Sequence, residues 1–280
     1  MSEDEPKSLS QVENELIVRP FAIELLRATR PVYLIPTDRP ETALMAIGSG
    51  FFLRYLNRTF FLTASHVARE SQQGQLFVPF INETLQAFGG RFFHTGDWSK
   101  PEADDRIDLA FIEVSPELAI QLPRDNYLTC EQWTLTDSPG PHAHYLLLGW
   151  PAKRNQPHRL RPYKLPRAPI SFLDAARPTS DYQEYGIKPR THYAVNFDRK
   201  RVLDDQRKVI SPPALRGLSG GPCFFFHRYR AREDLLRLRT PQLVGLIIEQ
   251  HRDAVVAVRL SILLRLITQQ FDTPPGTAGP

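Results

Sequence analysis

Short apolar segments bounded by turn residues fill most of the chain after residue 31. They are rich in β-branched and aromatic side chains and too short for typical helices, which is the pattern of strands. The sequence predicts strands at 32–35, 43–47, 50–55, 59–63, 75–79, 87–93, 109–114, 145–148, 193–197, 243–249 and 254–258. Asn57 and Arg58 separate two aromatic-rich segments and indicate a hairpin turn there.

Apolar positions repeat at helical spacing only near the two ends of the chain. Ser10 and Glu13 fit a capping box, and Pro20 fits the first turn of a helix. Residues 259–271 carry apolar side chains at helical spacing, which predicts a C-terminal helix, and 272–280 read as a mobile tail. Because long helices do not alternate with the strands, the pattern favours an all-β barrel or sandwich over a doubly wound fold.

Composition narrows the class of protein further. The 280 residues are 41% hydrophobic and 24% charged, with a formal net charge of +4, which excludes global disorder. Arg259 and Arg265 interrupt the apolar C-terminal stretch, so no membrane helix is expected. The N-terminus is acidic and lacks a secretory signal, so we expect a cytoplasmic protein whose two cysteines, Cys130 and Cys223, are reduced thiols.

The segment from 149 to 211 is rich in proline and arginine and reads mostly as loop. Its basic residues, and a second basic cluster at 228–239, are most simply solvated loops, so nucleic acid is not an expected partner. His142 and His144 could lie on one face of a strand, but no third ligand has suitable spacing. We therefore expect no metal.

The most informative segment is Gly-Leu-Ser-Gly-Gly-Pro at 217–222. A serine flanked by glycines lies where the backbone turns tightly and exposes N–H groups, which is how a nucleophile and an oxyanion hole are built together. Two further residues could complete such a site. His66 follows the apolar strand at 59–63, and Asp108 stands at the head of the strand at 109–114, where an imidazole N–H could satisfy its carboxylate.

Together the three segments resemble the trypsin-like serine peptidases of the chymotrypsin-fold superfamily, in a bacterial intracellular form. Thr-Ala-Ser-His at 63–66, Asp-Leu-Ala at 108–110 and Gly-Leu-Ser-Gly-Gly-Pro at 217–222 match the three boxes of that superfamily in its order. The resemblance implies two six-stranded antiparallel β-barrels. We expect an N-terminal helical extension at 1–30, a first barrel at 31–150 carrying His66 and Asp108, and a second barrel with the C-terminal helix at 151–271 carrying Ser219.

The roles follow from the same resemblance. Ser219 would be the nucleophile, His66 the general base and Asp108 the group that orients the imidazole, with N–H groups of Gly217 and Ser219 as the oxyanion hole. This implies a serine endopeptidase that acts on a protein or peptide without a cofactor, and it leaves open a regulatory protein partner. The nucleophile elbow of α/β-hydrolases is disfavoured, because too few residues follow Ser219 to supply its acid, its histidine and the rest of its sheet. The alternative is a catalytically silent pseudoprotease that binds a protein or nucleic acid.

Overall fold

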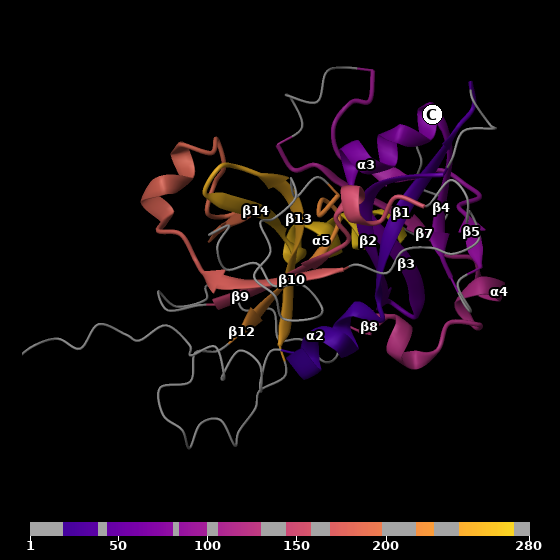
Figure 1. The fold of residues 1–280 in the computed structure, drawn as a ribbon, viewed down its shortest axis with the longest axis horizontal. Helices are drawn as coiled ribbons and strands as arrows, with labels where there is room; N and C mark the ends of the chain where they lie inside the picture. Colours follow the sequence, from indigo (N-terminus) through magenta and orange to yellow (C-terminus); the bar gives the residue numbers. More distant parts are fainter. Residues whose placement is uncertain are drawn as a thin grey trace, which may run out of the picture.

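The computed structural model describes residues 19–38, 44–80, 84–99, 106–129, 144–157, 169–197, 217–226 and 241–271. Its strands form two sheets that lie side by side (Figure 1). Nearly all strand pairs are antiparallel, and the chain ends in a helix that follows the last strand. The all-β fold predicted from the sequence, with two antiparallel β-units and a C-terminal helix, is therefore confirmed.

The first sheet has eight strands rather than the expected six, because it includes short strands that the pattern did not separate. Its order is β5-β4-β1-β2-β3-β7-β6, and β8 pairs with β2 in parallel. The strands are β1 (Thr29–Pro36), β2 (Met45–Tyr55), β3 (Arg58–Ala64), β4 (Gly74–Pro79), β5 (Leu85–Ala87), β6 (Phe93–His94), β7 (Leu109–Glu113) and β8 (Leu128–Thr129).

Three local expectations in this sheet need correction. The predicted strands at 43–47 and 50–55 are one strand, β2, which continues through residues 48–50. The predicted strand at 87–93 is instead split into β5 and β6, with Gly90 between them in a left-handed conformation. The β2–β3 turn is centred on Leu56 and Asn57, which both have positive φ as a type I′ hairpin requires, and not on Asn57 and Arg58.

The second sheet has six strands in the order β10-β9-β12-β13-β14-β11. An antiparallel bridge between Ala176 and Val195 links the end of β10 to β11, so the sheet closes on itself. The strands are β9 (His144–Gly149), β10 (Ile170–Ala175), β11 (His192–Asn196), β12 (Pro222–Phe226), β13 (Gln242–Gln250) and β14 (Ala254–Arg259). The predicted boundary between the two barrels at residue 150 is wrong, because β9 precedes it and pairs with β10 and β12 of the second sheet. Neither β10 nor β12 was among the predicted strands.

Helices and 3₁₀ turns precede, connect or follow the strands in the described chain. They are α2 (Arg19–Leu26), α3 (Ser65–Arg69), α4 (Pro116–Ala119) and α5 (Leu260–Phe271), with 3₁₀ turns η2 (Glu70–Gln72), η5 (Arg124–Asn126), η7 (Ala152–Arg154) and η8 (Thr179–Gln183). The N-terminal extension is helical over α2, but the capping box at 10–13 and the tail at 272–280 lie outside the described residues. Within the described part of the chain, no helix has the length and apolar character needed to cross a membrane.

One buried apolar cluster joins the two units. It runs from phenylalanines of β2 and β3 to leucines of β9 and β13, and α5 contributes buried leucines to it. Phe271, at the end of α5, packs on Phe60 with ring centroids 5.3 Å apart, while α5 also contacts β13. Since burial of apolar surface is the main favourable contribution to folding, this shared core holds the units together and fixes the surface between them.

Candidate active site

His66 lies in the first turn of α3, directly after β3 ends at Ala64. Two contacts join it to Asp108: the His66 backbone N–H donates to Oδ1 at 2.8 Å, and Nδ1 lies 2.7 Å from Oδ2. The side chain of Asp108 is 16% exposed and that of His66 33% exposed. Both carboxylate oxygens of Asp108 therefore face the histidine, which fixes the orientation of the imidazole and leaves part of the ring accessible.

Asp108 has a left-handed backbone, with φ of 49°. Such a conformation is uncommon for a residue with a side chain, although aspartate tolerates it better than most. Its carbonyl accepts a hydrogen bond from the Ser65 backbone N–H at 3.0 Å, so the backbone and the carboxylate of Asp108 are both tied to the start of α3. Strained backbone held by surrounding bonds is typical of functional sites.

A second set of hydrogen bonds holds the residues next to His66 and Asp108 in the chain. The Ser65 hydroxyl donates to the Thr95 carbonyl at 3.1 Å and accepts from Trp98 Nε1 at 2.9 Å. The Thr95 hydroxyl accepts from the backbone N–H of Leu109 at 2.8 Å, immediately after Asp108. The roles of Thr95 and Trp98 were not predicted from the sequence, because nothing in their spacing links them to His66 or Asp108, and Ser65 was recognised only as part of the segment at 63–66.

Ser219 lies in a tight turn between the end of the undescribed segment at 216 and β12. Gly217 and Gly220 have φ of 105° and 90°, and a Cβ on Gly220 would lie only 1.9 Å from the Ser49 carbonyl oxygen. The turn is bonded to β13, since the Gly220 N–H donates to the Ile247 carbonyl at 2.7 Å. These glycines are therefore required by the backbone, as the sequence pattern suggested.

The turn meets the first sheet at Ser49 of β2. The Ser219 carbonyl accepts from the Ser49 N–H at 2.9 Å, and the Ser49 carbonyl accepts from the Thr63 hydroxyl at 2.7 Å. Thr63 stands three residues before His66. The structure thus joins His66 to Asp108. It connects the Ser219 turn, through Ser49 of β2, to Thr63 in the strand that leads to His66.

The Ser219 side chain is not joined to the imidazole by a hydrogen bond, since its hydroxyl makes none with any described residue. Hydrogen bonds of catalytic groups are often long in unliganded structures and shorten when substrate binds. The N–H groups of Gly217 and Ser219 likewise donate to no other described residue. Both groups expected to form an oxyanion hole are therefore not bonded within the described part of the chain.

Cys223 is fully buried in β12, four residues after Ser219. Burial raises the pKa of its thiol well above the usual range, so the reactive thiolate is disfavoured. Cys130, the second cysteine, lies outside the described residues.

Among the residues that the structure describes, no three histidine, cysteine, aspartate or glutamate side chains are grouped to hold a metal ion. Of the two histidines considered for zinc, only His144 is described.

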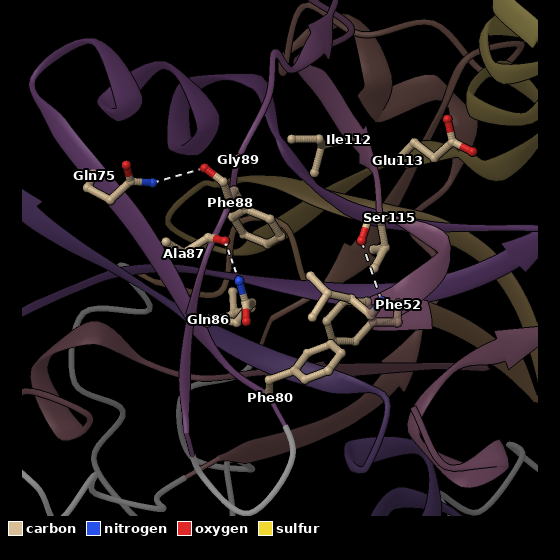
Figure 2. Close-up of a pocket in the computed structure, with 13 residues that line it drawn as sticks. Phe52, Gln75, Phe80, Gln86, Ala87, Phe88, Gly89, Ile112, Glu113 and Ser115 are labelled. Atoms are coloured by element: carbon tan, nitrogen blue, oxygen red, sulfur yellow. Dashed lines mark hydrogen bonds between the residues drawn. The ribbon is translucent and has the colours of Figure 1, made fainter. Parts of the chain in front are cut away.

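A cavity of about 360 Å³ lies in the first β-unit, away from the residues above (Figure 2). Phe52, Phe80 and Phe88 form its apolar wall, and Gln75 and Gln86 stand near it with their amide N–H groups bonded to backbone carbonyls. His66, Asp108 and Ser219 do not line it. This cavity is therefore separate from the candidate active site.

Comparison with known proteins gives a likeness in structure and none in sequence. No protein-family model matches the chain, and no curated protein matches it either. Among solved structures, it is similar to kallikrein-related peptidase 10, with a TM-score of 0.49 and 12% identity, over 89% of this chain and 97% of that one. A likeness at this identity concerns the fold alone, so the chemistry has to be inferred from the residues of the site.

Proposed function

We propose that the protein is a serine endopeptidase that cleaves peptide bonds through an acyl-enzyme on Ser219. The observation that carries the proposal is the pair of hydrogen bonds between His66 and Asp108, together with a glycine turn that holds Ser219 and is bonded to the first sheet. A carboxylate that fixes an imidazole, a partly accessible ring and two N–H groups that donate to no other described residue are the parts that acyl transfer requires.

In this mechanism Ser219 Oγ attacks the carbonyl carbon of the scissile peptide while His66 Nε2 accepts the hydroxyl proton. Asp108 holds the tautomer that carries its proton on Nδ1 and stabilises the imidazolium that forms. The N–H groups of Gly217 and Ser219 would stabilise the negative oxygen of the tetrahedral intermediate.

Collapse of the intermediate breaks the carbon–nitrogen bond, and His66 returns its proton to the leaving amine. Water then attacks the acyl-enzyme, with His66 again accepting a proton, and the carboxylic acid product leaves with Ser219 restored. The atoms and protons balance without a cofactor, and the proposed substrate is a protein or peptide.

The test is hydrolysis of fluorescein-labelled casein by the parent protein and by Ser219→Ala. Ser180→Ala is the matched control, since Ser180 is exposed in η8 and its hydroxyl bonds, among the described residues, to its neighbour Asp181. We expect hydrolysis by the parent and by Ser180→Ala, and a loss of about 10⁴-fold or more in Ser219→Ala.

Equal hydrolysis by Ser219→Ala and the parent would remove Ser219 from the mechanism. A folded parent that hydrolyses nothing would favour the non-catalytic binding module over the peptidase.

A further inference from the structure

Ser49 lies at the contact between the two β-units and makes hydrogen bonds to both. Nothing in the sequence indicates this role. Ser49 lies in β2 between Gly48 and Gly50, and it is fully buried. A buried serine is costly unless its polar atoms are bonded, so its partners show what it is for.

Every polar group of Ser49 is used. Its N–H donates to the Ser219 carbonyl at 2.9 Å, and its own carbonyl accepts from the Thr63 hydroxyl at 2.7 Å. Its hydroxyl donates to the Gly217 carbonyl at 2.5 Å and accepts from the Trp150 N–H at 2.8 Å. One residue of the first sheet therefore holds the Ser219 turn, the residue after β9 and the strand that leads to His66.

The two carbonyls that Ser49 holds belong to Gly217 and Ser219, the residues whose N–H groups donate to no other described residue. Fixing both carbonyls restricts the rotation of the neighbouring peptide planes. Without this restriction, rotation about the backbone bonds of Gly217 could turn the N–H groups on either side of it away from the oxyanion.

The surrounding packing leaves little freedom for another arrangement. A Cβ on Gly217 would lie 2.3 Å from the Ala152 nitrogen, and one on Gly149 would lie 3.1 Å from the Ser49 hydroxyl. The turn, the residues after β9 and β2 are thus in close backbone contact around one hydroxyl. An alanine at position 49 would leave the Gly217 carbonyl and the Trp150 N–H without their shared partner.

We propose that Ser49 is a positioning residue for the oxyanion hole, which acts by holding the carbonyls of Gly217 and Ser219 and so limits the rotation of the adjacent peptides that carry the N–H groups of these two residues. The inference rests on the proposed peptidase function. It assigns Ser49 no contact with substrate, so its removal changes transition-state stabilisation rather than substrate binding.

The test compares the parent with Ser49→Ala and Ser49→Cys. The cysteine has a similar shape and offers only a weak donor, so it carries the test if the alanine variant does not fold. Thr29→Val is the matched control, because Thr29 is fully buried and its hydroxyl donates to the Leu25 carbonyl at 3.2 Å, outside the site.

Two readouts apply to each variant. The first is hydrogen–deuterium exchange of residues 217–226, which follows the turn whether or not the protein is active. The second is kcat and KM on a quenched fluorescent peptide that the parent cleaves. We expect Ser49→Ala to speed exchange in the turn and to lower kcat about 10- to 100-fold, with KM changed less than about twofold. Ser49→Cys should fall between, and Thr29→Val should match the parent in both readouts.

Unchanged exchange in folded Ser49→Ala, or an increase in KM with kcat preserved, would overturn the role of Ser49 alone. A parent protein that cleaves no peptide would overturn the proposed function and with it the catalytic role of Ser49. In that case the exchange data would still show whether Ser49 holds the turn, so the two failures are distinguishable.

Discussion

The two β-units contribute to the candidate site in different ways. The first unit supplies two side chains, His66 and Asp108, which are held mainly by bonds to each other and to the start of α3. The second unit supplies a turn whose shape depends on glycines and on backbone bonds to β13 and to Ser49. Changes in the two halves should therefore have different effects. Side-chain changes in the first half should lower activity, and backbone changes in the second should lower stability.

The largest effect is expected from Asp108→Asn, which tests the side-chain half. An amide can offer its N–H to Nδ1 and so favour the wrong imidazole tautomer, while the shape of the site stays nearly the same. We expect kcat/KM to fall about 10⁴-fold, or about 5.5 kcal/mol, with little change in melting temperature. Steady-state kinetics and thermal unfolding would measure both. A loss below tenfold would show that Asp108 does not orient His66.

Gly220→Ala tests the backbone half. The new Cβ would lie 1.9 Å from the Ser49 carbonyl oxygen at a φ of 90°, so the turn or β2 has to move. We expect the free energy of unfolding in urea to fall by about 3 kcal/mol or more. Gly89→Ala is the control, because its Cβ would meet no atom within 4 Å, and it should change stability by less than about 1 kcal/mol. Similar stabilities of the two variants would contradict a turn fixed by backbone contacts.

His192 provides a pH test of the contact between the units. This residue of β11 lies with Nε2 2.8 Å from the carbonyl of Arg106, two residues before Asp108. Burial lowers the pKa of His192 below its usual 6.5. The unfolded chain therefore binds a proton that the folded chain does not, so stability is fully present above about pH 6.5 and decreases as the pH falls toward the lowered pKa.

His192→Gln keeps an N–H donor but does not titrate, so its free energy of unfolding should decrease less than that of the parent between pH 7.5 and pH 5.5. Urea unfolding at both pH values gives the comparison. The same decrease in both proteins would place the acid sensitivity elsewhere.

The smallest effect is expected from Arg27→Ala, which removes an ion pair at the surface of the first unit. Arg27 and Asp125 lie 2.5 Å apart, but their side chains are 57% and 42% exposed. Exposed pairs contribute little because water and salt screen them, so we expect a loss below about 1 kcal/mol in urea unfolding. A larger loss would show that an exposed ion pair contributes substantially to the free energy of unfolding of this protein, which would contradict the expected screening by water.

Local patterns predicted most strands and the three segments of the candidate site. Short apolar segments, glycine turns and a carboxylate before an apolar strand can each be recognised from a few consecutive residues. The strand at 145–148 was recognised, but its place in the second sheet depends on pairing with β10 and β12, which no local pattern encodes. The strand β10 alternates between buried and half-buried positions, yet its proline-rich surroundings hid it.

The hydrogen bonds of Ser49 could not be predicted from the sequence for the same reason. Its partners Gly217 and Trp150 are 168 and 101 residues away in the chain, and only the packing of the two units brings them together. Sequence therefore predicted the groups proposed to react, whereas the residues that position them had to come from the fold.

The most direct test of the central claim is intact-mass measurement after incubation with a fluorophosphonate, on the parent protein and on Ser219→Ala. An activated serine beside a histidine base forms a covalent adduct with this reagent. The account predicts one adduct on the parent, mapped to Ser219, and none on the variant. The absence of an adduct on the folded parent, or equal labelling of both proteins, would contradict it.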